Sequence, residues 1–343
     1  MLIIICRIFS IITSFRQSSG GLQSFLRVGK MTSIKNEEVD VSSSLAPGSS
    51  GDDGVAVCYL CLDGEVDDAG QPLRRDCACR GTDAGFVHLS CLTNYAATIS
   101  KQSCDMIGFA MPWHTCPNCH QEYQNELAVD IANKFASFVR GQYPDDTQRQ
   151  VEALHLKLGT LMNMFPHRLL PVRKREAGVT ADVLLSMIDR MKGEVSPLPR
   201  RYSLFEAHAH NVHGLIALIE GTEESARRAV AHLEMYLKVC KTIGDDEGIA
   251  VAKANIAIAK SKYEGGNIEE VLETSREVYE LYVSKYGEGS EIPIEAGKFY
   301  AIYLQKANRR DEARELLTKL LATSKQVLGP HHKTTKNIEL SLK

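Results

Sequence analysis

The spacing of apolar and polar residues divides the chain into regions of different character. From residue 124 onward apolar positions recur every three or four residues, as in NELAVDIANKFASFVRGQ, which predicts amphipathic helices. Several prolines between 165 and 200 surround one further helix, predicted at 180–192, so we assign 124–200 to a helical connecting segment. Residues 31–54 are rich in Ser, Gly and Asp with almost no apolar periodicity, which predicts a disordered linker.

An apolar stretch, MLIIICRIFSIITSF, opens the chain. It is about fifteen residues long and is broken by Arg7, whereas a bilayer span needs about 20 apolar residues. It also lacks the basic segment and the cleavage site of a signal peptide. We therefore interpret residues 1–30 as a dispensable leader. A translation start at Met31 is the alternative, and membrane association through the stretch stays open.

Residues 201–343 contain an internal repeat. GNIEEV at 266–271 aligns with NRRDEA at 308–313, an offset of 42 residues, and GTEESA at 221–226 lies 45 residues before GNIEEV. Each unit contains two helical runs, which the pattern predicts at 247–264, 268–286, 292–307 and 310–327. A fixed period of this length is typical of a solenoid, whose units bury their apolar faces only against neighbouring units.

These repeats resemble the tetratricopeptide repeat family in its longer form, as in kinesin light chains. The resemblance rests on small residues at matching positions of the two helices in each unit, namely Gly214, Ala259, Ala301, Ala226, Val271 and Ala313. It implies an all-α solenoid of stacked helix pairs, with a concave groove that binds protein or peptide segments. A plain helical bundle with accidental similarity is the alternative.

Composition and charge narrow the classes of function. Of the 343 residues 44% are hydrophobic and 24% charged, which excludes a collagen-like, a wholly disordered or a polytopic membrane protein. The 40 basic and 43 acidic residues nearly cancel, so the chain has no global positive field that would bind a nucleic acid. Neither a glycine-rich phosphate loop nor a nucleophile–base pair in a recognisable motif is present, so nothing favours a hydrolase.

Cysteine is the most informative residue type. Eight of the ten cysteines lie between Cys58 and Cys119. Seven of them form four closely spaced pairs with one histidine: Cys58 and Cys61, Cys77 and Cys79, His88 and Cys91, Cys116 and Cys119. These donors suffice for two closed tetrahedral zinc sites with no open position for a reactive water. We therefore expect two structural Zn²⁺ ions to hold residues 55–123 together. Thiolate ligands persist in a reducing compartment, so we expect the cytoplasm or the nucleus.

The order, spacing and neighbours of these residues resemble the RING-CH (RING-variant) family, above all in CACRGTDAGFVHLSCL, from Cys77 to Leu92. The resemblance implies a small α+β RING-like domain in which the ligand pairs interleave as a cross-brace. One zinc is then held by Cys58, Cys61, His88 and Cys91, and the other by Cys77, Cys79, Cys116 and Cys119. A PHD finger has the same ligand order and is the alternative, although Trp113 lies three residues before Cys116 instead of two.

The same resemblance implies partners. RING-type domains bind a ubiquitin-conjugating enzyme charged with ubiquitin and position its thioester for attack by a substrate lysine, with no catalytic residue of their own. The family's apolar docking surface corresponds here to Leu60, Trp113 and Pro117. We expect Trp113 to be an exposed anchor, with packing in the small core as the alternative. His120 stands where many RING ligases carry a basic residue, and Tyr95 stands where the family often has tryptophan.

Several further residues are assigned no site. Cys104 is interpreted as a spare thiol, and His114 as a residue that the Cys116/Cys119 pair makes unnecessary as a ligand. The stretch between Cys91 and Cys116 is 24 residues long and is predicted to hold a surface loop. The nearby histidines His208, His210 and His213 are interpreted as ordinary residues of the repeats.

Two functions remain. The first is a RING-CH-type ubiquitin ligase that docks a conjugating enzyme on the zinc module and recruits a protein substrate through its helical repeats. The second is a non-enzymatic adaptor in which both regions bind proteins. The substitution at His120 favours the adaptor, whereas the presence of Leu60, Trp113 and Pro117 favours the ligase.

Overall fold

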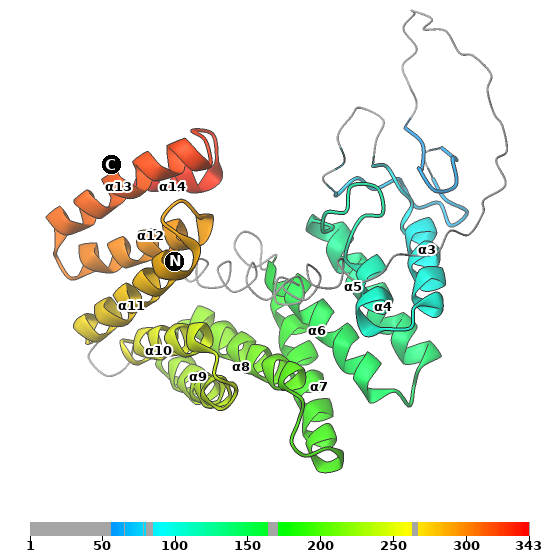
Figure 1. Ribbon diagram of the computed structural model, residues 1–343, viewed down its shortest axis with the longest axis horizontal. Coiled ribbons are helices and arrows are strands. Elements are labelled where there is room, and N and C mark those ends of the chain that lie inside the picture. The colour runs from blue at the N-terminus through cyan, green and yellow to red at the C-terminus, as the bar shows by residue number, and fades with distance from the viewer. Residues whose placement is uncertain are drawn as a thin grey trace, which may run out of the picture. The chain divides into compact units, whose positions relative to one another are not determined.

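The computed structural model of the protein describes residues 56–64, 66–77, 79, 85–163, 171–262 and 267–342. The predicted leader and linker, residues 1–30 and 31–54, lie outside the described residues. The described chain forms two compact units, of which one ends at Ile131 and the other begins at Ala132. The helices of both are labelled in Figure 1.

The first unit has little regular structure apart from one helix, α3 (Leu89–Gln102). Two short helices pack against it, α4 (Met106–Ala110) and the 3-10 helix η1 (Met111–Trp113). Its β part consists, among the described residues, of three isolated antiparallel bridges: Val66 with Pro72, Arg74 with Val87, and Thr115 with Glu122. The buried apolar side chains are few, mainly Val87, Leu92, Ala96, Phe109 and Trp113. A core of this size needs additional stabilisation from disulfides or metal ions.

The predicted surface loop between Cys91 and Cys116 is wrong, because this stretch holds α4 and η1 and buries part of its length. Phe109 and Trp113 are 1% and 2% exposed. The indole N–H of Trp113 donates to Ser100 Oγ at 2.7 Å, and that hydroxyl donates to the carbonyl of Phe109, also at 2.7 Å. These two hydrogen bonds connect α4 and η1 to the last turn of α3. They also give the indole N–H of Trp113 and the hydroxyl of Ser100, which are both buried, an acceptor each.

The second unit is entirely helical in its described residues. Helix α5 (Asn125–Gln142) crosses the boundary between the units, and nine helices follow it: α6 (Thr147–Asn163), α7 (Pro171–Glu194), α8 (Arg200–Glu220), α9 (Glu223–Ile243), α10 (Asp246–Lys260), α11 (Ile268–Tyr286), α12 (Glu291–Lys306), α13 (Arg310–Val327) and α14 (Lys333–Leu342). From α6 onward each helix packs against the next, and Figure 1 shows the resulting succession of helix pairs. The predicted all-α repeat region is confirmed. None of the described helices is both long and apolar enough to cross a bilayer.

Helix α7 is longer than the sequence pattern indicates, by almost a factor of two. The prediction places a helix at 180–192, whereas α7 extends from Pro171 to Glu194. Proline at the first helical position lacks only an N–H group that would have no intrahelical partner, so it begins this helix instead of breaking it. Helices α6 and α7 therefore form a pair that precedes the repeats identified from the sequence, and α7 packs on α8.

Small residues allow the helices of a pair to approach closely. A Cβ atom on Gly214 of α8 would lie 2.6 Å from Cγ of Leu233 on α9, so only glycine fits at this crossing. The other small positions of the repeats are all buried, with exposures of at most 2%: Ala226, Ala259, Val271, Ala301 and Ala313. The buried Val271 shows that the middle unit accommodates a larger residue at this position.

Candidate metal centres

The first predicted set of ligands comes together in space. The ligand atoms of Cys58, Cys61, His88 and Cys91 all lie within 4.8 Å of one another. Nδ1 of His88 is 3.4 Å from Sγ of Cys61 and 3.8 Å from Sγ of Cys91. Four donors at about 2.3 Å from a tetrahedral zinc are separated by roughly 3.8 Å, so these distances fit a zinc ion.

The orientation of His88 supports the same assignment. Its side chain is 1% exposed, and its Nε2 lies 3.0 Å from the carbonyl oxygen of Gly64. A carbonyl oxygen can only accept, so Nε2 carries the proton and donates it, which leaves the lone pair of Nδ1 facing the sulfur atoms. A second hydrogen bond of this kind is usual for metal-binding histidines because it fixes the tautomer and the ring plane.

The second set, Cys77, Cys79, Cys116 and Cys119, also has all four ligand atoms within 4.8 Å. The Sγ atoms of Cys79 and Cys116 are 3.8 Å apart. Gly85 lies against this site with φ +86°, and a Cβ atom there would be 2.8 Å from Cβ of Cys79. Both the backbone conformation and the available space therefore require glycine at this position.

The two C-x2-C pairs have the same backbone hydrogen bonds. The N–H of Cys58 donates to the carbonyl of Asp63, and the N–H of Leu62 donates back to Cys58. The second pair repeats this with Cys116, Gln121 and His120. In both, the residue directly after the second cysteine is left-handed, with φ 65° at Leu62 and φ 55° at His120. These turns hold each cysteine pair on one side of its site.

Several thiols of the clusters need a nearby cation to ionise at neutral pH. Burial raises the pKa of Cys91 to about 12, and burial also raises the pKa of Cys77. At Cys58, burial is outweighed by hydrogen bonds from backbone N–H groups, and its pKa falls to about 7. A bound dication would remove the remaining protons, and seven sulfurs with one imidazole are the donor set that zinc prefers. Zinc would supply cross-links for folding, and the described donors leave no open position for chemistry.

The remaining candidate residues lie outside the two ligand clusters. Cys104 is exposed and belongs to neither cluster. The imidazole of His114 is also outside both clusters, with Nε2 3.8 Å from a carboxylate oxygen of Glu122. Among the described residues, His208, His210 and His213 contribute to no group of converging ligand atoms.

The prediction that Trp113 is an exposed anchor is wrong. Its side chain is 2% exposed and its only polar atom is hydrogen-bonded inside the unit, so it belongs to the core. In a domain with few apolar residues the largest one is needed for packing. Leu60 and Pro117 are half-buried and His120 is exposed, so these three remain accessible at the surface.

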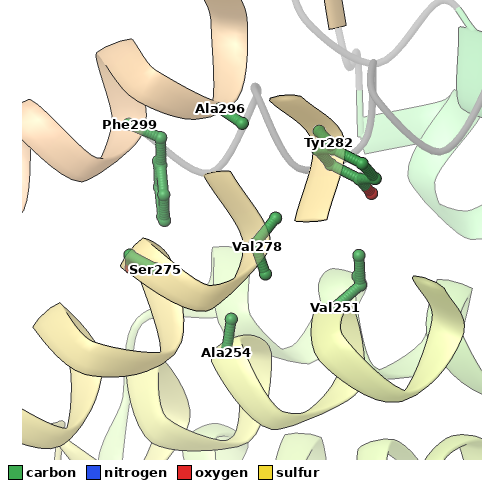
Figure 2. A pocket seen from close by; sticks show the side chains of 7 residues that line it. All are labelled: Val251, Ala254, Ser275, Val278, Tyr282, Ala296 and Phe299. Carbon is green, nitrogen blue, oxygen red and sulfur yellow. The ribbon is translucent and has the colours of Figure 1, made fainter. Parts of the chain in front are cut away.

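An apolar pocket lies among three consecutive helices of the second unit. Figure 2 shows the side chains that line it: Val251 and Ala254 of α10, Ser275, Val278 and Tyr282 of α11, and Ala296 and Phe299 of α12. The hydroxyl of Ser275 donates to the carbonyl of Val271 at 2.6 Å, so it offers no free donor. The lining side chains are almost all buried, and the hydroxyl of Tyr282 among them has no hydrogen-bond partner in the described part of the chain, so the pocket is a small gap in the packing of these helices.

Comparison with known proteins agrees with the geometry of the zinc module. The family model of the RING-variant domain matches residues 58–106, so the chain contains such a domain. The matched stretch ends before Cys116, and the structure adds the last ligand pair to the second cluster. No curated protein matches the chain.

A solved structure resembles the helical part. It is the Q17M crystal structure of a protein from Podosopora anserina, designated a kinesin light chain with nearly identical TPR-like repeats. It is 12% identical, covers 69% of this chain and 95% of its own, and has a TM-score of 0.41. The repeat architecture described above rests on the helices of this chain itself.

Some features of the zinc module were not predicted from the sequence. The hydrogen bond between Trp113 and Ser100 joins residues 13 positions apart, and no sequence pattern indicates it. The left-handed residues Leu62 and His120 are not glycines, so their conformation also leaves no signal. Gly85 could have been found, because a glycine inside a cysteine-rich signature often marks a tight backbone position.

Proposed function

We propose that this protein is a RING-type ubiquitin ligase, which docks a charged ubiquitin-conjugating enzyme on the zinc module and recruits a protein substrate through its helical repeats. The observation that carries the proposal is the RING-variant match on a region whose eight ligands form two interleaved clusters. The catalytic cysteine belongs to the conjugating enzyme, and the zinc module acts by positioning.

The proposed docking surface consists of Leu60, Pro117 and His120. Leu60 lies in the turn of the first C-x2-C pair, whereas Pro117 and His120 belong to the second. Since both turns have the same hydrogen bonds, they present a rigid pair of loops. Trp113 is not part of this surface.

The helical repeats are proposed to bind the substrate. Stacked helix pairs, as in α8–α13, form a surface that can hold an extended peptide segment. A substrate held by the same chain as the zinc module is present near the thioester at a raised effective concentration.

The test is ubiquitin-chain formation in vitro with the full, zinc-loaded chain and a panel of charged conjugating enzymes. The variant Leu60→Ala with Pro117→Ala should lose chain formation while still binding two zinc ions. The matched control is Val66→Ala, because Val66 is 56% exposed and lies outside both cysteine turns. Equal activity in the double variant and the control would reject the proposed surface.

A non-enzymatic adaptor is the second candidate, and the exposed His120 favours it. A neutral imidazole offers one hydrogen bond and no fixed charge to ubiquitin and the conjugating enzyme. Absence of chains with every conjugating enzyme, at two bound zinc ions per chain, would support the adaptor over the ligase.

A further inference from the structure

Histidines are distributed unevenly over the helical unit. Five of them lie on α6, α8 and α9: His155, His208, His210, His213 and His232. Helices α10, α11, α12 and α13 contain none. Because each unit of a solenoid contacts only its neighbours, the two halves can respond differently to protonation.

Three of these histidines form a cluster where α7, α8 and α9 meet. His210 and His213 belong to α8 and His232 to α9, and all three are half-buried. The rings of His213 and His232 stack with centroids 4.7 Å apart. Nδ1 of His210 lies 3.3 Å from Nδ1 of His232, and Nε2 of His213 lies 3.0 Å from a carboxylate oxygen of Asp182 on α7.

The geometry of this cluster is that of neutral imidazoles. Of the two Nδ1 atoms that face each other, one must donate and the other accept, so the contact is lost when both rings are charged. Stacked rings also do not direct their nitrogens to one point, which agrees with the lack of a third ligand cluster among the described residues.

The charged groups around the cluster do not compensate three protons. Asp182, Asp189 and Lys192 face it from α7, and Arg228 faces it from α9. Lys192 also pairs with Glu206 of α8. Asp182 and Asp189 favour protonation, whereas Lys192 and Arg228 oppose it. These four charges therefore cancel and leave three imidazolium ions without net compensation. Burial is the largest effect: it lowers the pKa of His210 to about 4 and lowers the pKa of both His213 and His232.

A second pair lies between α6 and α8. Nε2 of His155 is 2.8 Å from Nδ1 of His208, and His155 stacks on Phe205 with centroids 3.7 Å apart. Arg201 faces this pair, and its own partner is the buried carboxylate of Glu152. Burial raises the pKa of Glu152 to about 7, so protonation of this carboxylate below pH 7 favours the folded state and partly offsets the histidines. Burial lowers the pKa of His208 to about 4, and burial also lowers the pKa of His155. This pair, too, is stable only while it is uncharged.

We propose that α6–α9 form an acid-sensitive segment: protonation of the two histidine clusters opens the packing among α6, α7, α8 and α9, while α10–α13 remain packed. The direction follows from linkage. An unfolded histidine binds its proton near pH 6.5, and the folded ones bind it at lower pH. Their contribution is fully present above pH 6.5 and is lost as the pH falls toward the folded pKa. The inference is independent of the ligase proposal.

Hydrogen exchange of the full chain, read by mass spectrometry at pH 7.5 and 5.5 and corrected for intrinsic rates, tests this. For a folded pKa of about 4 at His208 and His210, each adds about a tenfold increase in opening at pH 5.5. Protonation of Glu152 offsets about tenfold of this increase. Peptides of α8 and α9 should therefore lose protection about tenfold, and peptides of α11–α13 should change little. An equal loss of protection in both groups of peptides would overturn the proposal.

Substitutions test whether the cluster of His210, His213 and His232 causes the loss of protection at acid pH. His210→Gln with His232→Gln should remove most of the acid effect, whereas the exposed His331→Gln should leave it unchanged. If the double variant loses its far-UV circular dichroism at pH 7.5, Asp182→Asn replaces it. That change removes the carboxylate that favours protonated His213 in the folded state, so it should enlarge the acid effect. No difference between Asp182→Asn and the parent, or between the double variant and His331→Gln, would contradict the cluster's role.

Discussion

The two units of this protein are stabilised in different ways. The zinc module has one long helix, three isolated bridges among its described residues and a handful of buried apolar side chains. The helical unit has successive helix pairs joined by small buried residues, and none of its described side chains form a metal-binding group. The first unit depends for its stability on eight metal ligands in addition to a small apolar core. The second unit depends on close packing between helix surfaces.

The difference shows what each unit tolerates. In the zinc module, polar residues outside the clusters can vary as long as the cysteines are held on the same turns. In the helical unit, the positions that matter are those where one added methyl group meets a neighbouring helix. A change confined to one unit should therefore leave the stability of the other unit unchanged.

Removal of zinc should have the largest effect on stability. It should unfold the first unit and leave the second unit folded. Structural zinc contributes about 10 kcal/mol or more to the folding of small domains, so a strong chelator should unfold the first unit. Trp113 is the only tryptophan and is buried there, so its emission should shift to the red. Most of the far-UV circular dichroism should remain, because the described residues of α6–α14 contain no group of converging metal ligands. A parallel loss of both signals would mean that the units do not fold separately.

Gly85→Ala should be the most damaging single methyl group in the zinc module. It adds left-handed strain and places Cβ 2.8 Å from Cβ of Cys79, for a total cost of about 3 kcal/mol. Gly70→Ala is the matched control, because Gly70 has φ +70° but open space around it. It should cost about 1 kcal/mol. Transfer of zinc to a chromophoric chelator compares the two, and equal rates would contradict the steric explanation.

Two helical glycines should respond to alanine in opposite directions. Gly214→Ala places Cβ 2.6 Å from Leu233 and should destabilise the helical unit by about 1–3 kcal/mol. Gly159→Ala in α6 meets nothing within 4 Å and should stabilise it by up to about 1 kcal/mol through helix propensity. Urea denaturation followed at 222 nm measures both, with Trp113 emission as the reporter for the other unit. If Gly214→Ala also raised the free energy of unfolding, the side chain of Leu233 would have room to move away from the added methyl group.

His120→Arg should have the smallest effect on stability and should still raise activity. Both residues are non-glycine side chains at φ 55°, so the stability of the zinc module should change by less than about 0.5 kcal/mol. If the protein is a ligase, one charge-assisted hydrogen bond of about 1.4 kcal/mol would increase chain formation roughly tenfold. His120→Gly, which relieves the left-handed conformation, is the matched variant and should stabilise without activating. Activation by both would rule out the hydrogen bond as the cause.

The metal ligands could be identified from the sequence because closely spaced pairs of cysteine and histidine are typical of zinc sites. Cys58, Cys61, His88 and Cys91 were grouped apart from the other four through a family resemblance, and the structure places their ligand atoms together. The helical runs were also predictable, since α11 and α13 have the predicted ends. Helix α7 was underestimated because proline was taken to interrupt a helix that it begins.

What the sequence alone determined, then, is which residues bind metal and where helices repeat, because both depend on spacing along the chain. Only the tertiary structure decided that Trp113 is buried, since its burial depends on how η1 packs against α3, where Ser100 accepts its indole N–H. It also decided that five histidines on three helices meet in two clusters. Contacts between helices depend on how their faces pack, and the order of residues along each helix does not fix that.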